Sequence, residues 1–271
     1  MRKLRRAFDT PDKKGRYVRR LFSTIADRYD IITVILSFGR DRFWKHQLVD
    51  QAVVKLKQKF PEIVYLQSEQ SVQKRKVDPS FAISVLDLAS GTGDLTFELE
   101  ARGAMVVGLD ITPRMVELAC SKQIQNQANC TFLVGDMMAL PFPNASFDLI
   151  TTGYGLRNVP ILESSLREIH RVLRPGGLFL SLDFNQPDNV LMRGIYFGYL
   201  TVVGSLLGAV LHFDPDTYRY ISISLRHYPG AVGVVSLMRK LKFVDVGCTL
   251  LLGGLMAINH GTKGEGRKAE I

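Results

Sequence analysis

From residue 83 onward, short apolar runs alternate with longer amphipathic stretches. Residues 83–88 are apolar enough for a strand that is buried on both faces, and residues 94–102 follow with helical spacing. The alternation continues through predicted strands at 105–109, 131–135, 147–152 and 178–184 and predicted helices at 113–126 and 162–173. This order is typical of parallel strands joined by right-handed crossovers, with helices on both faces of the sheet.

The two ends of the chain complete this picture. Residues 16–60 show helical spacing in two runs and predict a helical cap, whereas the polar residues 61–80 predict a surface loop. A helix at 231–241 precedes apolar runs at 243–251 and 254–259, which predict a closing antiparallel pair. The predicted fold class is α/β: a doubly wound, seven-stranded, Rossmann-like sheet, mostly parallel with the last strand antiparallel. An N-terminal helical cap and an inserted apolar helix accompany it.

The inserted helix is predicted at residues 194–213, which carry no charged side chain. Twenty such residues are long enough to span a bilayer. Its glycines also show the small-xxx-small spacing of membrane helix pairs, at Gly194 and Gly198 and again at Gly204 and Gly208. A membrane span between the fifth and sixth strands would split the sheet. A buried lid, or an apolar helix that faces an apolar substrate or the membrane surface, agrees better with the pattern.

Charge is concentrated at the N-terminus. The chain of 271 residues carries 35 Lys and Arg against 26 Asp and Glu, and residues 1–20 alone hold nine of those bases and two of the acids. The remainder is nearly neutral, which argues against a nucleic-acid groove. The basic arm could contact anionic lipid, or it could be a solvated extension. Three cysteines without metal-ligand spacing, and no secretory signal, predict a reducing cytosol.

We expect one domain, residues 21–271, behind the basic arm of residues 1–20. Its expected parts are a helical cap and loop at 21–82, a cofactor-binding core at 83–190, an apolar lid or substrate insertion at 191–230, and a C-terminal helix and strand pair at 231–271.

A glycine turn follows the first predicted strand of the core. Gly91 and Gly93 separate this strand from a helix, an arrangement that presents backbone N–H groups to a ligand. The alternative is a tight turn that only needs glycine for a positive φ. The dinucleotide fingerprint would place a third glycine at position 96, which is Thr96. Asp110 lies nineteen residues after Gly91 and suits a ribose, either of a dinucleotide or of S-adenosylmethionine.

Acidic residues also end neighbouring strands, and ligands of such sheets lie beyond the carboxyl ends of the strands. Asp87, just before the turn, could receive an ammonium group directly or through water. Asp136, at the end of the third strand, could accept from an adenine amine, with Met137 against the purine. Each acid could instead cap the next helix. Several strand ends that agree with one another favour S-adenosylmethionine as the ligand.

These motifs resemble those of class I S-adenosylmethionine-dependent methyltransferases. The resemblance lies in residues 85–96, Asp110, Asp136, Leu140-Pro-Phe-Pro, Ser146-Phe-Asp and Arg171-Val-Leu-Arg-Pro-Gly-Gly. Further stretches resemble the ubiquinone/menaquinone biosynthesis C-methyltransferase family. They are Tyr29-Asp with Leu36-Ser-Phe-Gly and Trp44-Lys, Gly155-Leu-Arg-Asn-Val, and Asp216-Thr-Tyr-Arg-Tyr-Ile with Ser224, Arg226 and Pro229. The similarity covers roughly residues 17–260.

The resemblance implies S-adenosyl-L-methionine as cofactor, no metal, and C-methylation of a polyprenylated quinol. The substrate would be a demethylmenaquinol or a 2-methoxy-6-polyprenyl-1,4-benzoquinol. The predicted cofactor-binding residues are Asp87, Gly91, Thr92, Gly93, Asp110, Asp136, Met137 and Gly153. The alternatives are a methyltransferase acting on another lipid-like small molecule, an NAD-dependent dehydrogenase, and a cofactor-binding protein without catalysis.

A quinol ring carbon becomes nucleophilic when the neighbouring phenol loses its proton. Unperturbed phenols titrate near ~10, so a nearby cation that favours the phenolate would help. We expect Arg157 to be this cation and Asn158 to fix the oxygen, because the resemblance places this pair beside the substrate. Arg157 cannot be the base, so water or Tyr29 would accept the proton. The pair could instead anchor its loop to backbone carbonyls.

Tyr218, Tyr220 and Arg226 are expected to line the substrate entrance, with ordinary packing of a lid as the alternative. The histidines share no ligand spacing, so no metal site is predicted. We expect a cytoplasmic enzyme that contacts the inner membrane face through its arm and apolar helix. A homodimer is left open, and no nucleic acid is expected.

Overall fold

The computed structural model describes residue 4, residues 7–59 and residues 83–265. The expected loop at 61–80 lies outside the described residues. The helices are α2 (Pro11–Ile25), η1 (Ala26–Arg28), α3 (Tyr29–Leu36), α4 (Asp41–Lys59), α5 (Asp94–Ala101), α6 (Pro113–Asn126), η4 (Leu156–Asn158), α7 (Leu162–Val172), α8 (Val190–His212), α9 (Asp216–His227), α10 (Gly230–Lys240) and η5 (Leu252–Gly254). The strands are β1 (Ser84–Leu88), β2 (Met105–Asp110), β3 (Thr131–Val134), β4 (Phe147–Gly153), β5 (Leu173–Phe184), β6 (Phe243–Leu251) and β7 (Met256–Lys263).

Seven strands form one sheet in the order β3-β2-β1-β4-β5-β7-β6. The pairs from β3 to β5 are parallel, and β7 runs antiparallel to both of its neighbours. The predicted fold class is thereby confirmed, with one strand reversed. Strand β5 begins earlier than expected, because Leu173 pairs with Phe147 before a shift in register. Helix α9 was not predicted as a separate element.

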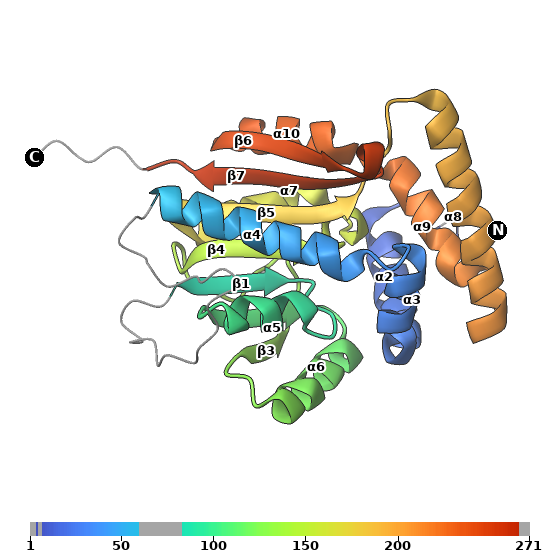
Figure 1. Ribbon diagram of the computed structural model, residues 1–271, viewed down its shortest axis with the longest axis horizontal. Coiled ribbons are helices and arrows are strands. Elements are labelled where there is room, and N and C mark those ends of the chain that lie inside the picture. The colour runs from blue at the N-terminus through green and yellow to red at the C-terminus, as the bar shows by residue number, and fades with distance from the viewer. Residues whose placement is uncertain (1–3, 5–6, 60–82, 266–271) are drawn as a thin grey trace, which may run out of the picture.

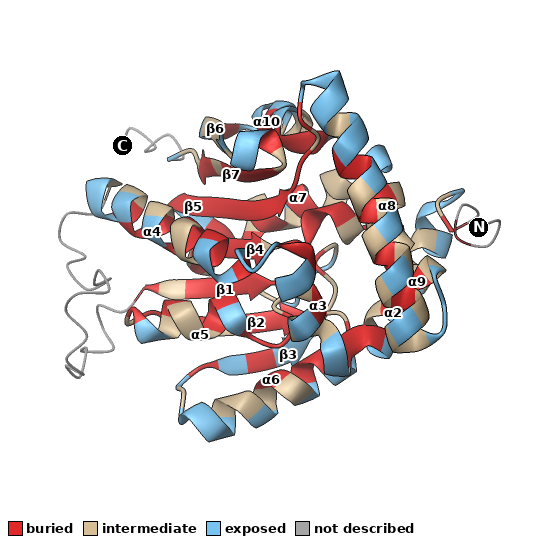
Figure 2. Cartoon of the chain, turned by 45° about the vertical axis from the view of Figure 1, so that its right-hand side comes forward, coloured by how far each residue is buried: buried red, intermediate tan, exposed pale blue. Residues whose placement is uncertain are grey.

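The sheet is covered on both faces, as its apolar strands require. Helices α4 and α5 lie in front of it in Figure 1, and α7 and α10 lie behind. The central strands are buried along most of their length, as Figure 2 shows, with side chains such as Leu86, Leu149 and Phe179 fully enclosed. The carboxyl ends of the parallel strands all point toward the same end of the molecule, where α2, α3, α8 and α9 lie (Figure 1).

These four helices form the cap, and they have an apolar cluster of their own. Its buried members are Leu4, Val18, Leu21, Ile25, Ile32, Leu36, Tyr218 and Tyr220. Helix α2 begins where Thr10 caps it by accepting a hydrogen bond from the backbone of Lys13, with Pro11 at the first position. The expected boundary at residue 20 therefore falls inside α2, and residues 11–20 of the basic arm belong to the cap.

Helix α8 packs along α9, and two of its glycines allow this close approach. A Cβ at Gly204 would come 3.0 Å from the carbonyl oxygen of Tyr218, and one at Gly208 would come closer still to that of Asp214. The spacing at Gly204 and Gly208 thus serves packing within the chain, whereas a Cβ at Gly194 or Gly198 would meet no atom within 4 Å. Among the described residues, α8 alone has the length and apolar character to cross a membrane, which by itself is weak evidence for a span. Most of the helix is not buried, so the expectation of a buried lid is wrong.

Candidate active site

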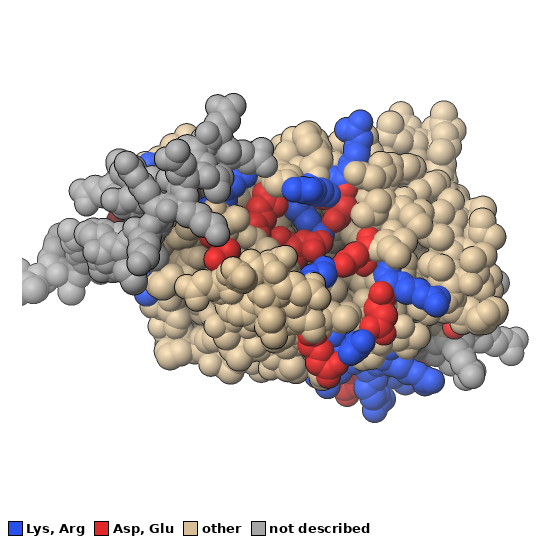
Figure 3. Space-filling model, turned by 60° about the horizontal axis from the view of Figure 1, so that its bottom comes forward, with Lys and Arg blue, Asp and Glu red and all other residues tan. Residues whose placement is uncertain are grey.

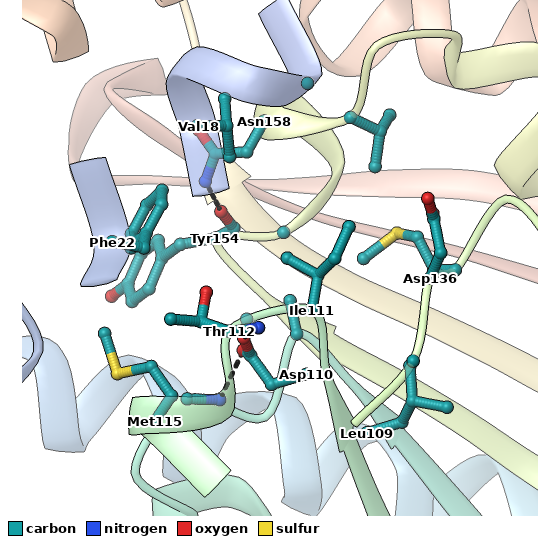
Figure 4. A pocket seen from close by; sticks show the side chains of 18 of the residues that line it. Val18, Phe22, Leu109, Asp110, Ile111, Thr112, Met115, Asp136, Tyr154 and Asn158 are labelled. Carbon is teal, nitrogen blue, oxygen red and sulfur yellow. Dashed lines mark hydrogen bonds between the residues drawn. The ribbon is translucent and has the colours of Figure 1, made fainter. Parts of the chain in front are cut away.

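Three neighbouring cavities lie between the sheet and the cap. The sheet-edge cavity, with about 680 Å³ of empty space, is bounded by Asp110, Asp136 and Gly153 on one side and by Val18 and Phe22 of α2 on the other (Figure 4). The turn cavity, of about 310 Å³, surrounds the glycine turn. The cap cavity, of about 560 Å³, lies among α2, α3, η4 and α9.

Asp110 ends β2 and lines the sheet-edge cavity, as predicted. Its Oδ2 accepts a hydrogen bond from the backbone N–H of Gly91 at 2.9 Å, and its Oδ1 accepts one from that of Thr112 at 2.8 Å. Burial raises the pKa of Asp110, although these two hydrogen bonds oppose the shift. Each carboxylate oxygen has a second lone pair, so the fixed carboxylate can still accept from a ligand diol.

The structure agrees with both interpretations of the glycine turn, as a tight turn that needs glycine and as backbone next to a ligand cavity. Gly91 and Gly93 have φ values of 56° and 97°, so the turn does need glycine. The same turn lines the turn cavity, and Gly91 also borders the sheet-edge cavity. Thr92 is held by its hydroxyl, which donates to Asp30 of α3 at 2.7 Å. Gly93 is the N-cap residue of α5 and lies against the rings of Phe97 and Phe132, outside the cavity linings.

Asp87 is buried in the wall of the turn cavity. The hydroxyls of Thr96 and Thr151 donate to its two carboxylate oxygens at 2.8 and 3.0 Å. Thr96 therefore has its own structural purpose at the position where a dinucleotide fingerprint would have glycine. Burial raises the pKa of Asp87 to about 7, against the effect of the two hydroxyls. A cation placed beside this carboxyl would favour its ionised form.

Asp136 follows β3 and lies across the sheet-edge cavity from Phe22 (Figure 4), and Met137 next to it in the chain also lines this cavity. The backbone N–H of Met138 donates to Asp136 Oδ1 at 2.9 Å, and Arg19 of α2 lies 3.5 Å from its Oδ2. Gly153 borders both this cavity and the turn cavity, and a Cβ there would come 2.9 Å from Leu95. The structure therefore brings seven of the eight predicted cofactor residues to the two cavities, and Gly93 to the turn beside them.

Two tyrosines line all three cavities, Tyr29 from α3 and Tyr154 after β4. Burial raises the pKa of Tyr29 to about 12, so it keeps its proton near neutral pH and is a poor proton acceptor. Tyr154 was not predicted. Its φ of 60° is unusual for a bulky residue, and its hydroxyl donates to the buried carboxylate of Asp41 at 2.7 Å.

Arg157 lies in the wall of the cap cavity and is almost fully buried. Its Nε lies 3.3 Å from Asp183 Oδ1, its Nη1 donates to Ser224, and its guanidinium lies 5.1 Å from the ring centre of Phe184. The backbone N–H of Arg157 also donates to Asp183, at 3.0 Å. Burial raises the pKa of Asp183, and Arg157 opposes this shift.

Asn158 borders both the cap cavity and the sheet-edge cavity. Its amide donates to the carbonyl of Tyr154 at 2.8 Å, and its carbonyl accepts from the hydroxyl of Tyr220 at 3.1 Å. Tyr218 and Tyr220 line the cap cavity, but they are buried inside it and do not stand at an entrance. Tyr218 hydrogen-bonds His212 of α8 at 2.7 Å.

The structure places Arg226 elsewhere. It is exposed, and its guanidinium stacks 4.3 Å above the ring of Phe197 in an open groove on α8. Arg226 does not line any of the three cavities. Its position on α9 turns Arg226 toward the outer side of α8, and its expected place at the substrate entrance stays a prediction.

Sequence reasoning missed three residues of this region: Tyr154, Asp183 and Lys45. Asp183 lies near the carboxyl end of β5, so the rule that selected Asp87 and Asp110 could have selected it as well. Lys45 lies in the middle of a helical pattern, and Tyr154 differs from its neighbours only in its backbone conformation. The backbone conformation of Tyr154 is not visible in the sequence, whereas Lys45 belongs to the Trp44-Lys stretch that resembles the family and could have been selected from it.

The residues present fit a nucleoside with a charged amino-acid end. Acids stand at the ends of β1 and β2, and the glycine turn leaves backbone exposed to the ligand. The buried hydroxyl of Ser90, in the turn cavity, has no hydrogen-bond partner among the described residues and is free to bind one. No group of three His, Cys, Asp or Glu residues suited to a metal ion occurs in the part of the chain that the structure describes.

The surface outside the site carries basic and acidic side chains close to one another. On the face turned forward in Figure 3, basic and acidic side chains are interspersed around a hollow, and broad areas beside them carry neither.

Comparison with known proteins agrees with this geometry. A sequence model of the ubiE/COQ5 methyltransferase family matches residues 10–263. The ubiquinone/menaquinone biosynthesis C-methyltransferases of Shewanella frigidimarina and of Shewanella sp. strain ANA-3 are each 33% identical to this chain, over 93% of its length and 92% of theirs. Among solved structures, a SAM-dependent methyltransferase of Thermotoga maritima superposes with a TM-score of 0.58 at 16% identity, covering 91% of this chain and 99% of that one. That likeness shows the fold alone.

Proposed function

The chain belongs to the ubiE/COQ5 methyltransferase family of S-adenosylmethionine-dependent C-methyltransferases, and on this basis we propose that it methylates a ring carbon of a polyprenylated quinol. The reaction would belong to menaquinone or ubiquinone biosynthesis, with a demethylmenaquinol or a 2-methoxy-6-polyprenyl-1,4-benzoquinol as acceptor. The observation that carries the proposal is the junction of the three cavities at Tyr29 and Tyr154. A nucleoside, its amino-acid end and an apolar ring would meet there.

When bound, S-adenosylmethionine supplies a methyl group on a positively charged sulfur. Asp110 would hold the ribose, Asp136 and Met137 the adenine, and Asp87 the ammonium group. The helix α2 covers this site from the cap side, with Val18 and Phe22 against the cavity (Figure 4). The protein then mainly orients the two reactants and excludes water, and orientation alone can supply about 7–11 kcal/mol.

Arg157 and Asn158 would act on the acceptor ring. Two of the five N–H groups of Arg157 are used by Asp183 and Ser224, which leaves three to approach a quinol oxygen. Such contact favours the phenolate, which makes the neighbouring ring carbon nucleophilic. Apolar side chains make up much of the remaining lining of the cap cavity, among them Leu21, Ile25 and Ile32, and they suit the first units of a prenyl tail.

Water is the proposed acceptor of the phenol proton. Tyr29 keeps its own proton near neutral pH, because burial raises its pKa to about 12. Its position at the junction suits a hydrogen-bond donor to the reacting groups. The dehydrogenase alternative is not favoured, since Thr96 is committed to Asp87 and the family is one of methyltransferases.

The test is transfer of a labelled methyl group. The purified protein is incubated with S-adenosylmethionine carrying a tritiated methyl group and with each of the two quinols, kept reduced. We expect label in at least one quinol and none in the matching oxidised quinone, which has no phenol to ionise. Tight binding of the cofactor without transfer to either quinol would contradict the substrate class.

We also propose that the enzyme works in the cytoplasm at an anionic membrane surface, from which its acceptor enters. The outer side of α8 exposes Val202, Leu206 and Val210. Phe38, at the end of α3, stacks on Tyr199 of α8 and extends this apolar surface. Arg193 and Arg226 border a groove along the same helix, and the N-terminal region adds further positive charge. The alternative is that a second copy of the chain covers this apolar surface. Sedimentation with and without vesicles distinguishes membrane binding from dimerisation.

A further inference from the structure

A buried lysine reaches from helix α4, on the face of the sheet, to the glycine turn. Lys45 is in α4, and its side chain is almost fully enclosed. Its ammonium donates to Asp41 at 2.6 Å, one turn back on the same helix, and to Asp94 at 2.8 Å, the first residue of α5. Lys45 also lines the turn cavity together with Asp87 and Ser90.

The two carboxylates keep this lysine charged. Burial alone would lower the pKa of Lys45, but Asp94 and Asp41 outweigh that effect and hold the pKa above its ordinary value. Asp41 is itself buried and fixed, because the hydroxyl of Tyr154 donates to its other oxygen at 2.7 Å. The ammonium group is therefore held at one place beside the cavity and carries a full charge at neutral pH.

Lys45 has one N–H group more than its two carboxylate partners use. A lysine ammonium has three N–H groups, and Asp41 and Asp94 account for two of them. Among the described residues that line the turn cavity, Lys45 is the one with a cationic side chain. The acids there, Asp87 and Asp94, suit an ammonium group, whereas a carboxylate in the same cavity needs a cation or N–H donors.

We infer that Lys45 binds the α-carboxylate of the cofactor's amino-acid end, while Asp87 faces the ammonium group. The inference rests on the proposed function and adds the residue that recognises the negative half of this zwitterion. Through Asp41, the same lysine is linked to Tyr154 at the junction of the cavities. Binding of the amino-acid end in the turn cavity would therefore affect Tyr154, which lies where the acceptor ring is proposed to bind.

Two ligands separate this role from a structural one. S-Adenosylhomocysteine carries the amino-acid end, and 5′-methylthioadenosine lacks it but keeps the nucleoside. Isothermal titration measures both with the wild-type protein, with Lys45→Met, and with Lys122→Met as a matched control. Lys122 binds Asp30 at 2.7 Å and lies 3.7 Å from Asp94, but it does not line the turn cavity.

Lys45→Met is expected to weaken S-adenosylhomocysteine about 10- to 100-fold, the effect of losing a charge-assisted contact, and to leave 5′-methylthioadenosine unchanged. Lys122→Met should change neither ligand by more than about 3-fold, as is usual for a partly exposed pair. Lys45→Arg should recover part of the lost affinity.

Because Lys45→Met leaves Asp41 without its partner, the double variant Asp41→Asn/Lys45→Met is measured as well, with thermal unfolding of each protein. Equal loss of both ligands, or no loss of either, overturns the inference. If the wild-type protein binds neither ligand, the proposed function itself fails and the inference fails with it.

Discussion

The carboxyl edge of the sheet and the helical cap contribute to one site in different ways. At the sheet edge, Asp87, Asp110 and Asp136 are held by short hydrogen bonds from nearby backbone or threonine hydroxyls. Beside the cap, Arg157 of η4 is held by partners more distant in sequence, Asp183 of β5 and Ser224 of α9. The edge is therefore specified mostly by partners near in sequence, with Thr151 as an exception that donates to Asp87 from the neighbouring strand. The acceptor side is specified by packing between distant segments.

This difference suggests a division of labour. Under the proposed function, the edge would bind the cofactor, and the acceptor side next to the cap would decide which acceptor enters. Substitutions at the edge should therefore change cofactor affinity, and substitutions in the cap should change turnover.

The largest expected effect is at the edge. Asp110→Ala should weaken S-adenosylhomocysteine on the order of 100-fold or more, because it removes the proposed ribose contacts and frees the N–H of Gly91. Isothermal titration measures the affinity, and circular dichroism checks that the variant is folded. Unchanged affinity would refute the assignment of Asp110 to the ribose.

The matching change on the acceptor side concerns Arg157, in the wall of the cap cavity. Removing this side chain alone would leave Asp183 buried without its partner, which costs about 3–5 kcal/mol. The better variant is Arg157→Met/Asp183→Asn, which removes both charges. We expect methyl transfer to fall about 10- to 100-fold, the range of one charge-assisted contact, with cofactor affinity near that of the wild-type protein.

Single-turnover kinetics and titration with S-adenosylhomocysteine provide the two readouts for this variant. A large loss of cofactor affinity would show that Arg157 serves the cofactor site and not the acceptor site.

A pH series sharpens the role of Asp87, whose pKa burial raises to about 7. If the ionised carboxylate binds the ammonium group, affinity for S-adenosylhomocysteine should rise up to about 10-fold per pH unit between pH 5.5 and 7 and then level. Asp87→Asn should flatten this profile. Since the folded pKa exceeds the unfolded one, the free energy of unfolding without ligand should fall as pH rises from about 4 to 7.

An affinity that does not change with pH in the wild-type protein would show that Asp87 does not face a charged group.

The smallest effect is expected on the outer surface of the cap. Val202→Ser/Leu206→Ser should reduce binding to vesicles rich in anionic lipid a few-fold. Its stability should stay within about 1 kcal/mol, because exposed positions contribute little. Ile124→Ser, an equally exposed substitution on α6, is the control and should leave vesicle binding unchanged. Co-sedimentation measures both, and equal loss in the two variants would rule out a specific membrane face.

Much of the sheet edge could be predicted from the sequence, because a strand end, a glycine turn and an acid at a fixed spacing lie close together in the chain. Tyr154 could not, since its role follows from a positive φ and from Asp41, more than a hundred residues earlier. The place of Arg226 could not be predicted for a related reason: the direction of α9 turns it outward, onto Phe197 of α8 and away from the three cavities. Helix α9 itself is specified by its packing against α8.

The arrangement of the three cavities is the central claim, and a crystal structure with S-adenosylhomocysteine and a reduced quinol analogue tests it most directly. We predict the nucleoside between Asp110 and Asp136, the amino-acid end between Lys45 and Asp87, and the sulfur at Tyr29 and Tyr154 facing a ring in the cap cavity. A quinol ring bound outside the cap cavity, or a sulfur directed away from it, would contradict the account.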